Sequence, residues 1–143
     1  ILILIILFTF NIKLFAKDTF LSLKNDKVNV RYQPTRNSPI KYIYKKINLP
    51  VKQIDKKENF RRIIDLKNNS GWIHWSQLKP TNSIIILEDK ILFKKPLNFS
   101  KPIARLEKGR LLVIKKCKKE WCKIKTGSYS GWVKTNNIWG SVN

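Results

Sequence analysis

The sequence is poor in the residues on which most active sites depend. Its 143 residues include one histidine, two cysteines, no methionine and only nine acidic side chains. Most of the carboxylates lie in turns beside lysines, whereas general acid–base catalysis needs pairs of titratable groups held in position. No serine or cysteine has the sequence context of a nucleophile. We therefore predict a protein that is not an enzyme and that uses neither a metal ion nor a cofactor.

Acidic residues are also too few to balance the basic ones. The formal net charge is +21, and a field of that size attracts polyanions. The lysines are scattered rather than gathered on one predicted face, and abundant Ile and Asn accompany them. That composition is typical of an A+T-rich genome, which accounts for part of the charge. Nucleic-acid binding is therefore only a secondary hypothesis.

The sequence has only one long apolar run, and it is too short to span a membrane. Residues 1–10 are almost wholly apolar and are followed by a mixed segment that ends at Ala16, whereas a spanning helix needs about 20 apolar residues. We expect residues 1–16 to be a signal peptide whose basic n-region is missing from this sequence, with cleavage after Ala16. The alternative is an amphipathic or core-facing element. An exported protein would seldom meet nucleic acid.

The two cysteines stand close together. Cys117 and Cys122 enclose four residues with the polar character of a hairpin turn, and facing strand positions within reach pair in an oxidising compartment. The alternative is half of a metal site, but the chain has no second Cys or His pair to complete four ligands. We predict a Cys117–Cys122 disulfide that closes a short loop.

The strongest positive signal is an internal repeat. Ser70-Gly71-Trp72-Ile73 recurs as Ser130-Gly131-Trp132-Val133, so the two glycines are 131 − 71 = 60 positions apart. A fixed period of this size indicates tandem units, and it favours a binding module over an enzyme. Units of this length bury only about 60% of their unfolded surface, so each is expected to be stabilised by contacts with its neighbour. The domains we expect are residues 20–78 and 84–140, joined by a linker at 79–83.

Each unit has the pattern of an all-β domain. Short apolar stretches such as Val51–Ile54 and Leu111–Ile114 recur at intervals of 8 to 12 residues, with turn-forming residues between them. Such spacing predicts a small barrel or sandwich rather than helices. One helical turn is expected at Ser76–Leu78. The fold class predicted is therefore all-β, with two tandem small barrels after the N-terminal segment.

These residues resemble the bacterial SH3-like family, the SH3b domains. Val28-Asn29-Val30-Arg31 approximates the first-strand signature of that family and Pro34 its loop proline, while Gly71-Trp72 and Gly131-Trp132 match its closing signature. The chain is similar to exported proteobacterial proteins with two such domains, in which a Cys pair flanks a Trp and a Trp-Gly pair, here Trp139-Gly140, closes the second unit. Two positions depart from the pattern, because Gln33 precedes the proline and Leu92-Phe93-Lys94 replaces Asn-x-Arg. Any groove that depends on that loop is therefore expected in the first unit.

The resemblance implies a partner as well as a fold. It implies two SH3-like barrels in the periplasm that bind peptidoglycan and its peptide stems without catalysis. The alternative is a scaffold module that docks an extended segment of an envelope protein, as peptide-recognition domains do. Binding of nucleic acid through the basic surface is the second alternative.

Several side chains could line a binding groove. The candidates for ligand contact are Arg31, Tyr32, Tyr42, Tyr44 and Trp75, since aromatic rings stack on sugar faces and prolines; the competing interpretation is that most of the aromatic residues are core. Trp72 and Trp132 are expected to be at least half buried in packing. Asn29 and Arg31 are expected to brace the loop, and Gly71 and Gly131 are expected to be structural, because a β-carbon would strain their dihedral. His74 is expected to have a structural or surface role.

Overall fold

The computed structural model describes residues 19–142, and the expected signal peptide lies outside them. Apart from one turn of 3-10 helix, η1 (Trp75–Gln77), the regular elements are strands. Among the described residues, no helix has the length and apolarity needed to cross a membrane. The strands are β1 (Thr19–Leu23), β2 (Val28–Arg31), β3 (Ile40–Tyr44), β4 (Pro50–Lys57), β5 (Phe60–Ile64), β6 (Ser70–His74), β7 (Leu78–Pro80), β8 (Ser83–Ile86), β9 (Lys90–Phe93), β10 (Pro102–Leu106), β11 (Leu111–Lys118), β12 (Trp121–Thr126), β13 (Tyr129–Lys134) and β14 (Ile138–Trp139).

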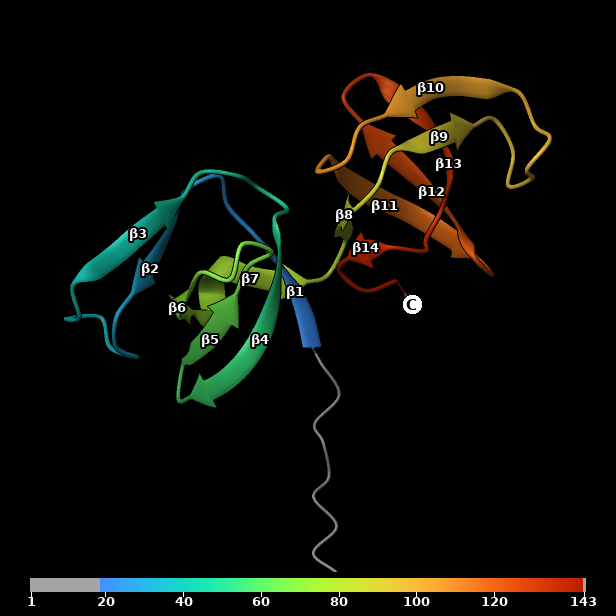
Figure 1. Ribbon diagram of the computed structural model, residues 1–143. Helices are drawn as coiled ribbons and strands as arrows, with labels where there is room; N and C mark the ends of the chain where they lie inside the picture. The colour runs from blue at the N-terminus through green and yellow to red at the C-terminus, as the bar shows by residue number, and fades with distance from the viewer. Residues whose placement is uncertain (1–18, 143) are drawn as a thin grey trace, which may run out of the picture.

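The strands form two sheets with the same topology. The first unit has the order β3-β2-β6-β5-β4-β1-β7, and the second has β10-β9-β13-β12-β11-β8-β14. All the strand pairs are antiparallel, and replacing each strand of the first sheet by its counterpart gives the order of the second. Figure 1 shows the two units side by side, with β1–β7 in blue to green and β8–β14 in yellow to red. The predicted all-β class and the tandem repeat are confirmed.

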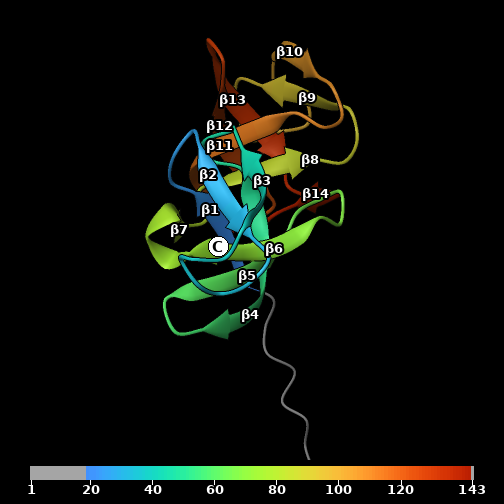
Figure 2. The same ribbon diagram turned by 90° about the vertical axis from the view of Figure 1, so that its left-hand side faces the viewer.

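Neither sheet closes into a hydrogen-bonded ring. In the described part of the chain, β3 and β7 are the unpaired ends of the first sheet, as β10 and β14 are of the second. The turned view in Figure 2 shows the strands of each unit crossing at steep angles rather than lying in one flat layer. The barrels expected from the sequence are thus open ones.

Each unit has its own hydrophobic core. In the first unit, Val28 and Val30 of β2 lie with Ile63 and Ile73 at zero exposure, and in the second unit Ile124 belongs to a separate cluster. Alternation along the strands produces both cores, because every second side chain points to the same face. Trp72 and Trp132 are partly buried but belong to neither cluster.

The signature glycines are required for a different reason from the one expected. Neither Gly71 nor Gly131 has a positive φ, so a strained dihedral does not explain them. A β-carbon at Gly131 would instead lie 2.7 Å from the backbone oxygen of Phe93, and one at Gly71 would collide with Val30. The glycines therefore permit the close approach of β6 to β2 and of β13 to β9.

The predicted disulfide is confirmed. Cys117 and Cys122 are bonded and form a directly opposed pair in the β11–β12 ladder. Cys122 is fully buried in the second core. The bond therefore ties a hairpin end of the second unit.

The two units touch through polar and aromatic contacts. Only Thr81 and Asn82 separate β7 from β8, within the segment 79–83 that we expected to be a linker. The Trp139 indole N–H of the second unit donates to the Pro50 carbonyl of the first at 2.9 Å. Its ring meets that of Phe20 edge-on, with centroids 5.0 Å apart. The short connection and these bonds hold the units against each other.

Candidate functional site

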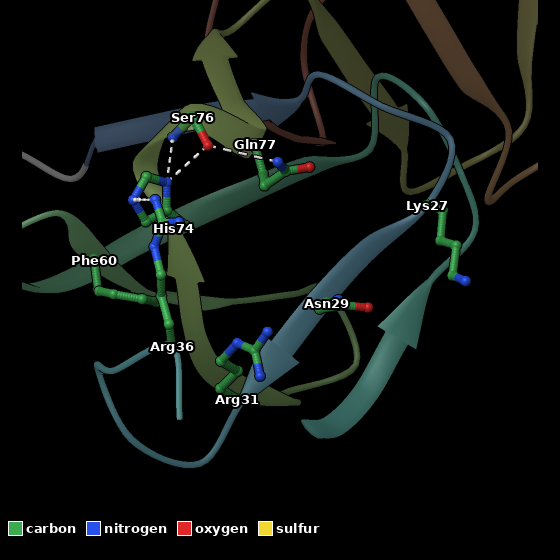
Figure 3. Close-up of a pocket in the computed structure, with 8 residues that line it drawn as sticks. All are labelled: Lys27, Asn29, Arg31, Arg36, Phe60, His74, Ser76 and Gln77. Carbon is green, nitrogen blue, oxygen red and sulfur yellow. Dashed lines mark hydrogen bonds between the residues drawn. The ribbon is translucent and has the colours of Figure 1, made fainter. Parts of the chain in front are cut away.

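The first unit carries a cleft with a basic lining. Its volume is about 280 Å³, and it lies between β2, the loop that follows β2, β6 and η1 (Figure 3). No acidic side chain is among the residues that line it. These residues are Lys27, Asn29, Arg31, Arg36, Phe60, His74, Ser76 and Gln77.

Strand alternation brings these side chains to one face. Because Val28 and Val30 point into the core, Asn29 and Arg31 point to the opposite face of β2. Phe60 lies opposite His74 in the β5–β6 ladder, and the two rings meet edge-on with centroids 5.2 Å apart. The sheet register therefore places Asn29 and Arg31 of β2 in the same cleft as the histidine of β6.

Arg31 braces the loop that completes the cleft. Its Nη1 donates to the Ser38 carbonyl oxygen at 2.8 Å, while the hydroxyl of the buried Ser38 accepts from the Gln33 amide at 2.9 Å. The loop held in this way carries Arg36, which extends toward the His74 ring in Figure 3. The bracing role that the sequence suggested for Arg31 is thus visible, and the rest of its guanidinium faces the cleft.

The contact between His74 and Arg36 brings two N–H donors together when the ring proton is on Nε2. The Ser76 amide can only donate, and it donates to His74 Nδ1 at 3.2 Å, with Ser76 Oγ 2.7 Å from the same atom. A neutral ring that accepts at Nδ1 carries its proton on Nε2. That N–H faces Arg36 Nη2 at 3.3 Å. In this tautomer an anion placed beside the two groups can accept from both of them.

The surroundings of His74 favour its neutral form. Desolvation lowers the pKa of His74 below its ordinary 6.5, and the neighbouring charge of Arg36 lowers it further. An anion bound beside both groups would raise the pKa of His74, because an opposite charge stabilises the protonated ring. The cleft can thus bind an anion through the arginines and take up a proton on His74 as it does so.

The other predicted contact residues lie apart from this cleft. Tyr32 is 56% exposed and, with Arg31 and Trp72, lines a second hollow of about 230 Å³. The Lys41 ammonium stands over its ring, 5.7 Å from the centroid. Trp75 is also exposed and lies beside His74, with ring centroids 6.2 Å apart, but it does not line the basic cleft.

Tyr42 and Tyr44 form a hydrogen-bonded chain against the first core. Their hydroxyl oxygens are 3.2 Å apart, and Tyr44 donates to Asp65 Oδ2 at 2.8 Å. Burial raises the pKa of both phenols, and the carboxylate of Asp65 raises them further. Both rings pack on the core cluster. This arrangement fixes β3 to the turn after β5.

Sequence reasoning did not identify Lys27, Arg36 or Gln77 as site residues. Arg36 stands in a proline-containing loop where nothing periodic marks it, and it meets His74 across 38 positions of sequence. The sequence analysis assigned His74 a structural or surface role. Comparison of the two repeats could have singled out Arg36, because the equivalent position of the second loop holds the uncharged Asn98.

The second unit does not reproduce the cleft. Phe93 lies opposite Trp132 as Arg31 lies opposite Trp72, so a ring replaces the guanidinium. Lys134 lies opposite Trp121 as His74 lies opposite Phe60. The rings of Phe93 and Trp121 meet edge-on at 5.8 Å, with Lys134 Nζ 5.6 Å from the Trp121 centroid. The expectation that the loop-dependent groove belongs to the first unit agrees with this difference.

Residues 19–142 contain no group of three or more His, Cys, Asp or Glu side chains placed to hold a metal ion.

Comparison with known proteins agrees with the duplicated architecture. A family model described as "Bacterial SH3 domain" matches residues 24–80 and again 90–140. No curated protein matches the chain. Two solved structures that it resembles are NlpC2 and NlpC1 from Trichomonas vaginalis, with 11% and 12% sequence identity and TM-scores of 0.41 and 0.38. The matches cover 89% and 88% of this chain but 49% and 47% of theirs, so the chain spans about half the length of either protein.

Proposed function

We propose that this chain, which belongs to the bacterial SH3 domain family and contains two such domains, is a non-catalytic binding protein of the cell envelope. Domains of this family are generally binding domains rather than enzymes. The ligand we propose is peptidoglycan, bound through its peptide stems, in the periplasm of a Gram-negative cell. Residues 1–16 would direct export. The basic cleft of the first unit would be the main point of contact.

The observation that carries this proposal is the pair of opposed donors in a cleft without acids. His74 Nε2 and Arg36 Nη2 are 3.3 Å apart, and the tautomer with the proton on Nε2 offers an anion two donors. Stem peptides carry free carboxylates, and one carboxylate has lone pairs enough to accept from both groups. A hydrogen bond between an arginine and a carboxylate is also stronger than one between neutral groups. A carboxylate of the stem therefore fits the cleft in charge and in hydrogen bonding.

Binding of a muropeptide to the full chain, measured by calorimetry at physiological salt, tests the proposal. Arg36→Gln is expected to weaken binding about tenfold, the loss typical of one charge-assisted hydrogen bond. Lys67→Gln is the matched control, because it removes the same charge from an exposed turn that does not line the cleft. Equal losses in the two variants would mean that net charge alone attracts the ligand, which would contradict the proposal.

Purified sacculi provide a second test. The protein is expected to sediment with sacculi at low salt and to remain bound at physiological salt, where exposed charges more than about 8 Å apart are largely screened. Retention of one defined envelope protein, with none on sacculi, would instead favour the scaffold alternative. Affinity that falls steeply with salt for DNA and sacculi alike would favour non-specific polyanion binding.

Export is tested separately with a reporter. Residues 1–16, preceded by an initiator methionine and a short basic segment, are fused to a protein that is active only outside the cytoplasm. We expect activity, and a reporter that stays inside the cell would contradict the periplasmic assignment. A second fusion in which three apolar residues of the run are replaced by Asp is the control.

A further inference from the structure

The second unit exposes two large apolar side chains at the tip of one loop. Phe99 is 102% exposed and Leu97 is 59% exposed, in the segment 94–101 that connects β9 to β10. Figure 1 shows this loop on the side of the second unit that faces away from the first. Full exposure means that the Phe99 ring packs against nothing in the protein, so its hydrophobicity does not stabilise the fold.

The duplicated loop of the first unit shows that the loop does not need these residues. Residues 32–39 and 94–101 share four bonds. In the first loop the amide of residue 35 donates to the carbonyl of residue 33 at 2.9 Å, and the equivalent bond in the second loop, from 97 to 95, measures 2.8 Å. The amide of residue 38 donates to the carbonyl of residue 35 at 3.3 Å, and the equivalent bond from 100 to 97 measures 3.1 Å. The two serine hydroxyls accept in the same way at 2.9 Å, and both loop ends are closed by a backbone bond. In this common frame Thr35 and Asn37 occupy the places of Leu97 and Phe99.

The exposed apolar pair is surrounded by positive charge. Lys94, Lys95 and Lys101 belong to the same loop, and with Leu97 and Phe99 they border a hollow of about 650 Å³. The end of β11 and the turn after it add two more lysines and one glutamate, which share a second hollow of about 590 Å³ with Leu97 and the buried Trp121. Five lysines and one glutamate leave the tip a net charge of 5 − 1 = +4.

We propose that this tip docks on an anionic phospholipid bilayer, with Leu97 and Phe99 inserted among the acyl chains and the lysines at the headgroups. Apolar side chains at an interface lie below the headgroup level, and lysine stems reach back from there to anionic lipids. A soluble polyanion would engage the lysines but has no apolar interior for Leu97. The bilayer is the partner that satisfies both features of the loop, and this surface is separate from the basic cleft of the first unit.

A dye placed inside the loop tests the insertion directly. The full chain carries Asn98→Cys labelled with an environment-sensitive fluorophore, since both native cysteines are in a disulfide and do not react. With vesicles that contain phosphatidylglycerol in phosphatidylcholine, the emission is expected to shift to the blue and to rise severalfold. A dye at Asn37→Cys, in the matching loop of the first unit, is expected to stay in water. Because the readout is local, binding of any other segment to the vesicle does not imitate it.

The matched variant gives the second unit the residues of the first. Leu97→Thr with Phe99→Asn is expected to abolish the blue shift and to weaken vesicle binding by this surface at least about tenfold, since even one large apolar side chain moved out of water accounts for that factor. Phe99→Asn alone removes no packing contact and is expected to give a smaller loss in the same direction. Muropeptide binding by the cleft is expected to stay unchanged in both variants, so failure of the two proposals can be told apart.

Three results would overturn the inference. They are a dye at position 98 that remains in water with anionic vesicles, a response that survives Leu97→Thr with Phe99→Asn, and an equal response to vesicles of phosphatidylcholine alone. The first of these results, combined with a blue shift produced by one envelope protein, would replace the bilayer with a protein partner.

Discussion

The side-chain hydroxyls of Ser22 and Ser83 lie 3.0 Å apart at the junction of the two units, and both serines have zero exposure. Ser83 Oγ donates to the Asn48 carbonyl, and Ser22 Oγ accepts from the Asn82 amide at 3.2 Å. Since the proton of Ser83 is used on Asn48, Ser22 is the donor between the serines. The three bonds form a directed chain that connects the first unit to the start of the second.

Removing one hydroxyl from this chain is expected to destabilise the protein. Ser83→Ala leaves the Ser22 hydroxyl and the Asn48 carbonyl without their partner in a dry contact, a change that costs about 1–3 kcal/mol. Chemical denaturation measures the loss. Ser128→Ala, in an exposed turn, is the control and is expected to be neutral. A neutral Ser83→Ala would mean that the junction contributes nothing to stability.

The aromatic contact between the units can be tested independently. Trp139→Phe preserves a ring against Phe20 but removes the N–H that donates to Pro50. We expect a loss of about 1 kcal/mol, the typical net value of such a bond, visible as a lower midpoint in denaturation. Ile138→Val, which shortens the neighbouring side chain without touching a hydrogen bond, gives the comparison for simple loss of packing.

Gly131 is expected to tolerate no β-carbon. Because that carbon would lie 2.7 Å from the Phe93 oxygen and 2.9 Å from Leu92 Cγ, Gly131→Ala should force β13 away from β9 and cost about 1–3 kcal/mol. Gly109→Asn is the control, since Gly109 has a φ of 91° with open space around it and asparagine accepts left-handed conformations more readily than most residues. If both changes cost the same, crowding is not what selects glycine at position 131.

Loss of the disulfide should weaken the second unit only moderately. The bonded cysteines are five positions apart, so the loop-entropy relation gives roughly 2 kcal/mol. Cys117→Ala with Cys122→Ala is expected to lower the free energy of unfolding by that amount, with the β11–β12 ladder still formed. Hydrogen exchange of the amides of β12 measures this, and β5 of the first unit serves as the internal control. Collapse of exchange protection in both units would contradict a local role.

The single histidine makes the charge state of the cleft directly measurable. We expect its ring protons to titrate in NMR with a pKa below 6.5, and Arg36→Gln to raise that pKa because it removes a like charge. A bound muropeptide should raise it as well, so affinity should increase as the pH falls toward the pKa of His74. The stability of the fold changes with pH in the opposite direction and decreases as the pH falls, since the unfolded chain binds the proton more readily. The stability that depends on neutral His74 is present above pH 6.5 and lost below it.

A pKa at or above 6.5, or one that Arg36→Gln leaves unchanged, would show that the two groups do not sense each other. Lys67→Gln is again the matched control for a change of net charge.

The features that the sequence predicted are those that depend on local chain geometry. The repeated Ser-Gly-Trp placed Gly71 and Gly131 at equivalent points of two sheets, and the spacing of Cys117 and Cys122 placed them opposite each other in a hairpin. The reason that the sequence suggested for these glycines, a strained dihedral, is wrong. Crowding by Val30 and Phe93 depends on strands that are distant in sequence, so no local pattern reveals it.

The candidate site was harder to predict than the fold. Arg31 was selected, but Tyr42 and Tyr44 belong to a hydrogen-bonded chain on the first core, while Arg36 was not selected at all. The sequence favours aromatic residues as candidates because their rings can stack on sugar faces and prolines. A positive cleft in a chain with 30 basic residues does not stand out in the same way.

By itself the sequence determined the duplication, the all-β class and the disulfide, because strand alternation, turn residues and cysteine spacing act over a few neighbouring positions. Only the tertiary structure decided which side chains meet. It brought Arg36 against His74 and Ser22 against Ser83, and it left Phe99 alone in solvent. Such pairings follow from the register and packing of whole sheets. Two segments that are distant in sequence become neighbours because their strands share a core, and neither segment alone predicts that contact.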